Sequence, residues 1–168
     1  MISTITHKRL LELVEYNPDS GDILSRIDRG SRCKKGKVLG TKNATGHIVL
    51  QLDKRMYLAH RLAWFYCFKE WPIGIIDHID RDPSNNRLDN LREATKATNN
   101  YNSKLYNTNT TGIKGAFFDC RRNKYYSQIV FNGKKTWLGY FNTSEEAGSA
   151  YAVAAKNLHG EFYNESLS

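Results

Sequence analysis

The feature that most constrains this chain is an adjacent acid and histidine, Asp77-His78, followed at fixed intervals by Asn90 and Asn99. His78 and Asn90 are twelve residues apart, Asn90 and Asn99 are nine apart, and a turn-forming run (Asp-Pro-Ser-Asn-Asn) lies at residues 82–86. Neighbouring side chains on a strand point to opposite sides, so at a strand end one can hold a metal while the other faces a substrate. The spacing predicts that a turn returns the two amides to this pair.

This spacing resembles the HNH nuclease family, in the branch common among phage and intron-encoded endonucleases. The resemblance covers about Met56 to Asn102, and the preceding run at residues 58–64 (Leu-Ala-His-Arg-Leu-Ala-Trp) is similar as well. It implies two short antiparallel strands and a helix that together bind one divalent metal. This unit as a whole would wrap around a single phosphate of the substrate. The activity that it implies is hydrolysis of a phosphodiester.

The resemblance also implies a role for each motif residue. His78 is the general base, since a neutral imidazole can accept a proton near pH ~7. Asp77 is a metal ligand, and Asn90 ties the loop through its amide and so orients His78. Asn99, where many members carry a second histidine, completes the protein's share of the metal shell through its carbonyl oxygen. Such an oxygen-only shell suits one magnesium or manganese ion per active site, acting as a Lewis acid, whereas zinc normally takes nitrogen or sulfur.

Other interpretations of these residues are open. An Asp-His pair alone in a polar turn usually lies on the surface without a function. Because Asn90 and Asn99 follow this pair at the spacing of the motif, catalysis is favoured. His60 lies in a helical apolar stretch and is predicted to be a hydrogen-bonded packing residue rather than a ligand. Two alternative functions stand beside the nuclease: a DNA-binding regulator whose motif has decayed, with Asn99 as the sign, and an RNA-binding protein.

The charge balance favours polyanionic partners, since the net charge is +8 and the pI is near 9.4. Two basic clusters are candidate phosphate contacts or, alternatively, solvated loops: Arg29, Arg32, Lys34, Lys35 and Lys37, and then Lys114, Arg121, Arg122, Lys124, Lys134 and Lys135. Three cysteines at unrelated spacings, Cys33, Cys67 and Cys120, favour neither a disulfide framework nor a Cys-x-x-Cys zinc site. No apolar run approaches the ~20 residues of a membrane span and no secretory segment is evident, so we expect a cytoplasmic protein without a membrane partner, in the host cytoplasm if phage-encoded.

Hydrophobic periodicity predicts an α+β fold in four segments. They are a strand-rich N-terminal segment (1–55), a central segment (56–103) for which the resemblance implies an HNH nuclease core of ββα-metal type, a polar linker (104–110) and a C-terminal three-stranded sheet with one helix (111–168). The predicted helices cover about residues 6–16, 59–69, 94–103 and 143–160, and the predicted strands cover 23–27, 47–52, 56–58, 113–118, 125–131 and 135–138. Asn132-Gly133 predicts a tight hairpin, and Thr143 with Glu146 predicts a capping box.

The last segment resembles the plant ethylene-response-factor type of DNA-binding domain over about Thr111 to Asn164. The shared runs lie at residues 112–114 (Gly-Ile-Lys), 137–141 (Trp-Leu-Gly-Tyr-Phe), 145–147 (Glu-Glu-Ala) and 158–162 (Leu-His-Gly-Glu-Phe). The resemblance implies a sheet lying in the major groove of double-stranded DNA. The DNA-contacting residues expected from it and from the basic loop are Lys114, Phe118, Arg121, Arg122, Gln128, Lys135 and Trp137. Ala116 and Val130 stand where that family usually carries arginines, which removes bidentate hydrogen-bond donors to guanine and puts base specificity in question. The basic residues of this segment could still bind phosphate, which positions a protein on DNA without reading its sequence.

Together these patterns predict a metal-dependent HNH endonuclease that nicks double-stranded DNA, with a C-terminal module that holds the duplex. A monomer with one site would nick, and a double-strand break would need a dimer or two sequential cuts. Its biological purpose stays open among intron mobility as a homing endonuclease, phage competition and genome packaging.

Overall fold

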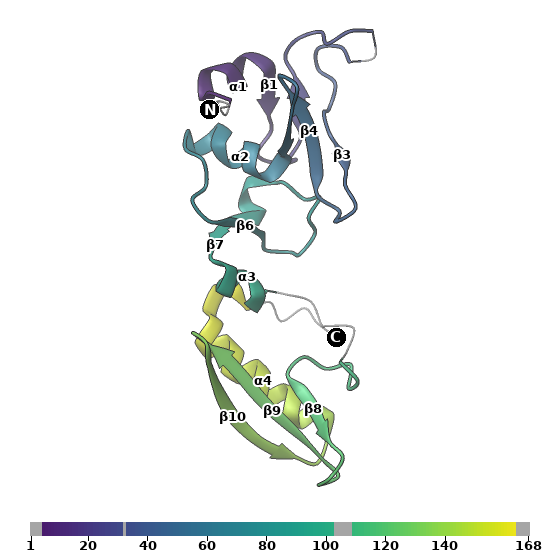
Figure 1. Cartoon of the computed structure of the whole chain (residues 1–168), viewed down its shortest axis with the longest axis vertical. Coiled ribbons are helices and arrows are strands. Elements are labelled where there is room, and N and C mark those ends of the chain that lie inside the picture. The colour runs from purple at the N-terminus through teal and green to yellow at the C-terminus, as the bar shows by residue number, and fades with distance from the viewer. Residues whose placement is uncertain (1–4, 32, 103–108, 164–168) are drawn as a thin grey trace. The chain divides into compact units, whose positions relative to one another are not determined.

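The computed structural model describes residues 5–31, 33–102 and 109–163 and has the mixed α+β fold that the sequence predicted (Figure 1). Arg32, the predicted helix end at Ser103, the predicted linker up to residue 108, and Asn164 lie outside these ranges. The chain divides into two compact units, Met1–Thr95 and Lys96–Ser168. The finer division at residues 55, 103 and 110 stays a prediction. No helix within the described ranges has the length and apolar character needed to cross a membrane.

The first unit opens with a helix that is shorter than predicted. α1 (His7–Leu13) begins at Thr6, whose side chain accepts a hydrogen bond from the Arg9 N–H. Residues 14–16, predicted as its last turn, instead form β1 (Val14–Tyr16), which pairs antiparallel with β2 (Ile23–Ser25). The reason is tertiary, since Val14 and Tyr16 are buried on either side of exposed Glu15, the two-residue period of a strand.

A second sheet and a helix complete the core of this unit. The sheet has the order β3 (Thr41–Lys42), β4 (Ile48–Leu52) and β5 (Arg55–Leu58), all antiparallel, and α2 (Ala59–Phe68) follows β5 directly. α2 packs against α1, β4 and β5, and Figure 1 shows α1 and α2 beside β4. The buried core comprises mainly Leu10, Leu13, Val14, Leu50, Leu52, Leu62 and Phe65.

The motif region is a hairpin anchored to that core. β6 (Ile75–His78) pairs antiparallel with β7 (Leu91–Ala94), and the one-turn 3₁₀ helix η1 (Leu88–Asn90) precedes β7. Ile76 and Leu91 are buried in the same cluster as α1 and α2, so the hairpin is held by hydrophobic packing and not only by its own ladder.

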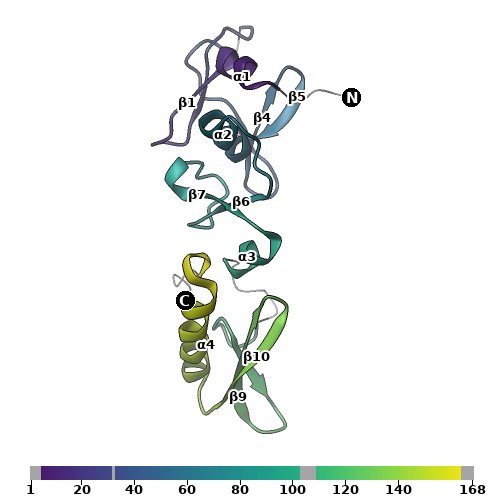
Figure 2. The same cartoon turned by 90° about the vertical axis from the view of Figure 1, so that its left-hand side faces the viewer.

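The second unit is a three-stranded antiparallel sheet with one long helix. The strand order is β10 (Lys134–Phe141), β9 (Lys124–Phe131) and β8 (Ala116–Asp119), and α4 (Ser144–His159) packs against all three strands. Figure 2 shows α4 along one side of the sheet. α3 (Lys96–Tyr101) lies at the start of this unit, two residues later than predicted because residues 91–94 pair with β6, and η2 (Gly160–Phe162) follows α4. The predicted hairpin and capping box are confirmed: Asn132 and Gly133 have φ of 49° and 77°, and Thr143 and Glu146 cap α4 reciprocally.

Candidate active site

The Asp77-His78 pair occupies the last two residues of β6, and both side chains are buried. Asp77 lies opposite Arg92 in the ladder, and the Arg92 Nε and Nη2 atoms donate to Asp77 Oδ2 at 2.9 and 2.7 Å. Both hydrogen bonds reach one carboxylate oxygen, so the charge of Asp77 is balanced within the hairpin itself. The sequence had predicted a metal ligand at this position and had not predicted a protein cation beside it.

The loop between β6 and β7 is closed by Asn90 around Asp80. Asn90 Nδ2 donates to Asp80 Oδ1 and to the Asn85 carbonyl, both at 2.9 Å, while Asn90 Oδ1 accepts from the Asp80 N–H at 3.0 Å. Asn85 Nδ2 donates to the other Asp80 oxygen at 2.6 Å. Burial alone would raise the pKa of Asp80, but the N–H of Asp82 and the amides of Asn85 and Asn90 hold it below its usual value. Asp80 therefore stays an acceptor that fixes the loop.

The asparagine that contacts the His78 ring is Asn86, which the sequence had not singled out as a site residue. Asn86 Oδ1 lies 3.4 Å from His78 Nε2, and Asn86 Nδ2 donates to the Ser84 carbonyl at 3.1 Å, which turns the amide oxygen toward the imidazole. Tyr16 holds the same segment from the core by donating from its hydroxyl to the Asn86 carbonyl at 2.7 Å. Asn90 closes the loop, and Asn86 is the residue of that loop that meets His78.

Two further histidines, which were not predicted to belong to the site, lie beside His78. His47, before β4, and His60, the second residue of α2, bring ring nitrogens to within 4.8 Å of one another and of a nitrogen of His78. The ring centroids are 5.2 Å apart for His47 and His60, 5.8 Å for His47 and His78, and 5.1 Å for His60 and His78. The prediction that His60 is a hydrogen-bonded packing residue is wrong in part: it is buried, but its Nδ1 has no hydrogen-bond partner.

Burial keeps two of these imidazoles neutral. It lowers the pKa of His60 to about 3, with His78, His47 and Arg61 adding repulsion. Burial and then the charge of His78 also lower the pKa of His47. The three histidines are 13 and 18 residues apart in sequence, which matches no recognisable metal-binding motif. The only signal in the sequence is that three of its five histidines lie between residues 47 and 78.

The fourth motif residue, Asn99, lies on α3 and belongs to the second unit, whereas Asp77, His78 and Asn90 belong to the first. Its assignment as a metal ligand, and the roles of the other three, stay predictions.

The predicted DNA-binding residues of the second unit divide between two faces of its sheet. Gln128 pairs with Trp137 and Val130 with Lys135, and these side chains lie on the face away from α4. Phe118 was expected on this face, but it shares a face with buried Ala116, because side chains two apart on a strand point the same way. Phe117 takes its place on the open face and stacks on Tyr126, which stacks in turn on Trp137, at centroid distances of 5.2 and 5.4 Å.

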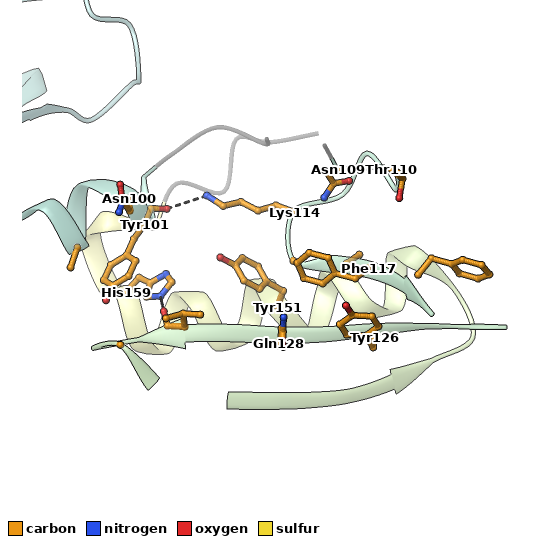
Figure 3. A pocket seen from close by; sticks show the side chains of 16 residues that line it. Asn100, Tyr101, Asn109, Thr110, Lys114, Phe117, Tyr126, Gln128, Tyr151 and His159 are labelled. Atoms are coloured by element: carbon orange, nitrogen blue, oxygen red, sulfur yellow. Dashed lines mark hydrogen bonds between the residues drawn. The ribbon is translucent and has the colours of Figure 1, made fainter. Parts of the chain in front are cut away.

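The basic residues of this unit are partly engaged within it. Arg122 Nη1 donates to the Tyr140 hydroxyl at 2.7 Å and lies 3.4 Å from Asp119 Oδ2, while Arg121 and Lys135 are exposed. Lys114 lines a cavity of about 670 Å³ whose other lining residues include Tyr101, Gln128, Tyr151 and His159. In Figure 3 the Lys114 amine reaches the Tyr101 carbonyl, at 3.1 Å, and its role as a phosphate contact stays a prediction.

Comparison with known proteins bears on the first unit and the start of the second. A family profile described as HNH endonuclease matches residues 57–101. Protein 3.8 of Escherichia phage T7 is 34% identical over 87 residues, which cover 52% of this chain and 71% of that protein. An uncharacterized HNH endonuclease of Acanthamoeba polyphaga mimivirus is also 34% identical over 87 residues, again 52% of this chain but 44% of that protein. No solved structure gives a significant match. The motif hairpin, the family profile and the phage relative together show that this chain belongs to the HNH endonuclease family.

Proposed function

We propose that this protein is a divalent-metal-dependent endonuclease that nicks double-stranded DNA by hydrolysing a phosphodiester. The observation that carries the proposal is the placement of His78 at the end of β6, beside Asp77 and against a loop that Asn90 and Asp80 close. Membership of the HNH endonuclease family supports a nuclease and a nucleic-acid substrate. The nicking activity and the duplex substrate are the parts that the proposal adds.

His78 acts as the general base in this proposal. A neutral imidazole can take a proton from the attacking water at physiological pH, and hydrogen bonding at one ring nitrogen orients the other. Asn86 supplies that contact, and Tyr16 holds the Asn86 backbone through its hydroxyl. Asn90 acts at one remove as a positioning residue, because its three hydrogen bonds fix the loop that carries Asn86.

The sequence motif, rather than the arrangement of the two units, is the basis on which we assign Asp77 and Asn99 as ligands of one magnesium or manganese ion. The donor chemistry fits, because carboxylate and amide oxygens are the ligands that these ions prefer. When bound, such an ion supplies Lewis-acid stabilisation of charge on the phosphate and the leaving 3′ oxygen. Arg92 is a second positive group beside Asp77, where it balances the carboxylate in the hairpin.

The open face of the second unit holds the duplex in this proposal. Lys135 is exposed beside Trp137, which is 51% exposed, and Gln128 lies next to Trp137 in the ladder. Exposed lysine and arginine bind phosphate in any sequence, and an exposed indole can contact bases or sugars. The resemblance to the ethylene-response-factor domain supports the sheet as the DNA-contacting element. Phe117 replaces Phe118 in the proposed contact face, because the strand register places it there.

One observation favours a DNA-binding protein that does not cut. The two hydrogen bonds from Arg92 already neutralise Asp77, which is the arrangement expected if the carboxylate served the hairpin's stability alone. The row of Phe117, Tyr126 and Trp137 would also suit stacking on unpaired bases, as in RNA-binding proteins.

Nicking of a supercoiled plasmid separates these functions. We expect conversion to the open circle with magnesium and none with chelator, and we expect His78→Ala to stop cutting while keeping DNA binding. His7→Ala is the matched control, since His7 contacts the Tyr66 carbonyl outside the site. Equal loss of cutting and binding in His78→Ala would contradict the division between the units. Cutting by Asp77→Ala in chelator would refute the metal assignment, and preference for RNA over duplex DNA in competition would refute the substrate.

A further inference from the structure

Three histidine side chains from three separate segments of the first unit lie close together and could bind a metal ion. His47 comes from the loop before β4, His60 from the first turn of α2 and His78 from the end of β6. One ring nitrogen of each lies within 4.8 Å of one ring nitrogen of both others. Two imidazole nitrogens bound to the same zinc ion are about 3.3 Å apart, since Zn–N bonds are about 2.0–2.1 Å long and the geometry is tetrahedral. Side-chain rotations of modest size would bring this cluster to that separation.

The hydrogen bonds around His47 assign its lone pair. Asn43 Oδ1 accepts from the Thr45 hydroxyl at 2.8 Å, so the proton of that hydroxyl points to Asn43 and its oxygen is left to accept. That oxygen lies 2.9 Å from His47 Nδ1, which therefore carries the ring proton. The lone pair of neutral His47 is then on Nε2. A second partner on the nitrogen opposite the metal is the usual arrangement of metal-binding histidines.

The other two rings are oriented in comparable ways. The Asn86 amide oxygen faces His78 Nε2, because the Asn86 amino group donates to Ser84, so that nitrogen is the one suited to carry the proton. His60 is 5% exposed and its Nδ1 has no hydrogen-bond partner, which is costly for a buried polar atom unless something else satisfies it. A metal ion at the cluster would account for the burial of a polar ring among the apolar residues that α2 buries, Ala59, Leu62, Ala63 and Phe65.

We propose that His47, His60 and His78 bind one transition-metal ion of the zinc type, at a site distinct from the oxygen-ligated magnesium of the proposed function. Three neutral imidazoles are a poor shell for magnesium and a good one for zinc, cobalt, nickel or copper. A fourth position is left for water or another ligand. His78 belongs both to this site and to the catalytic site of the proposed function, on which the next step rests. An ion bound here occupies the general base, so zinc inhibits the cutting that magnesium supports.

Direct binding tests the site without relying on activity. Co²⁺ is titrated into the tag-free, metal-stripped full chain and followed by its visible ligand-field bands and by calorimetry. We expect one ion per chain with the intense visible bands of tetrahedral nitrogen and oxygen coordination and no near-ultraviolet thiolate band, and we expect zinc to displace it. A thiolate band would assign the metal to Cys33, Cys67 or Cys120 and overturn the proposal.

Matched variants locate the ion. His47→Gln, at a half-buried loop position, should weaken Co²⁺ binding at least tenfold, and His7→Gln, which removes an imidazole elsewhere in the same unit, should leave it unchanged. His60→Gln is a second test, and circular dichroism shows whether it folds. Equal affinities in His47→Gln and the unaltered chain would overturn the proposal.

The nicking assay then separates this inference from the proposed function. Zinc added to the magnesium reaction should inhibit at the concentration that half-saturates the site, and His47→Gln should shift inhibition to higher zinc in step with its affinity. Zinc binding at the cluster in a chain that never nicks would sink the proposed function and leave the site standing. Nicking that is insensitive to saturating zinc would overturn the inhibitory role.

Discussion

His60 should make the first unit lose stability steeply in mild acid. The pKa of His60 lies near its ordinary 6.5 in the unfolded chain and is lowered to about 3 in the fold, mainly by burial. A depressed pKa means that the unfolded chain binds a proton that the folded chain refuses. Its contribution is therefore fully present above pH ~6.5 and is lost as the pH falls toward about 3. Between pH ~7.5 and pH ~5 these values give a loss of about 2 kcal/mol in the free energy of unfolding.

The test compares the slope of stability against pH in the unaltered chain and in His60→Leu. Urea unfolding is followed by the fluorescence of Trp64 and Trp71 in a Trp137→Phe background, so that only the first unit reports. The variant should keep about 2 kcal/mol more of its stability over this pH interval, whatever its stability at neutral pH. His47, whose pKa is also lowered, is present in both chains and its effect largely cancels. Parallel slopes would refute the reasoning that burial keeps His60 uncharged.

Three further predictions follow from the geometry of single residues. Gly21→Ala should destabilise the first unit by at least ~2 kcal/mol in thermal unfolding, because φ is +79° and the new Cβ would lie 2.6 Å from the backbone nitrogen of Arg87 in the motif loop. The control is Gly30→Ala, at φ +101° with nothing within 4 Å of the new Cβ, which should cost only about 1 kcal/mol. Equal costs in the two variants would contradict the role of the close approach to Arg87. Lys135→Ala should weaken binding to every duplex alike and reduce the slope of log affinity against log salt by ~1, whereas a change of preferred sequence would argue for base contact. Thr143→Ala removes the hydroxyl that caps α4 and should cost the second unit about 1 kcal/mol, seen as faster hydrogen exchange along α4, with Thr136→Ala on an exposed strand position as the control.

The elements that were predictable from the sequence are those whose cause lies within a few residues. The Asn132-Gly133 turn follows from the backbone angles that these two residues tolerate, and the Thr143–Glu146 capping box from hydrogen bonds across a single helical turn. The motif hairpin was implied by the resemblance to the HNH family, although the helix carrying Asn99 begins later than predicted. The first helix was predicted too long, because local periodicity gave no sign that Val14 and Tyr16 pair with a later strand.

The sequence by itself determined the α+β class, the HNH motif and the position of His78 in it. Only the tertiary structure decided what surrounds that histidine. Arg92 faces Asp77 because β6 and β7 pair in one register, and His47 and His60 reach His78 because β4, α2 and the β6–β7 hairpin share one hydrophobic core. The register of β8 against β9 likewise could not be predicted from local sequence. It places Phe117 and not Phe118 on the open face, since a shift of one residue in a strand moves every side chain to the opposite face. Local signals depend on chain neighbours, whereas these contacts depend on how apolar surfaces far apart in sequence are buried together.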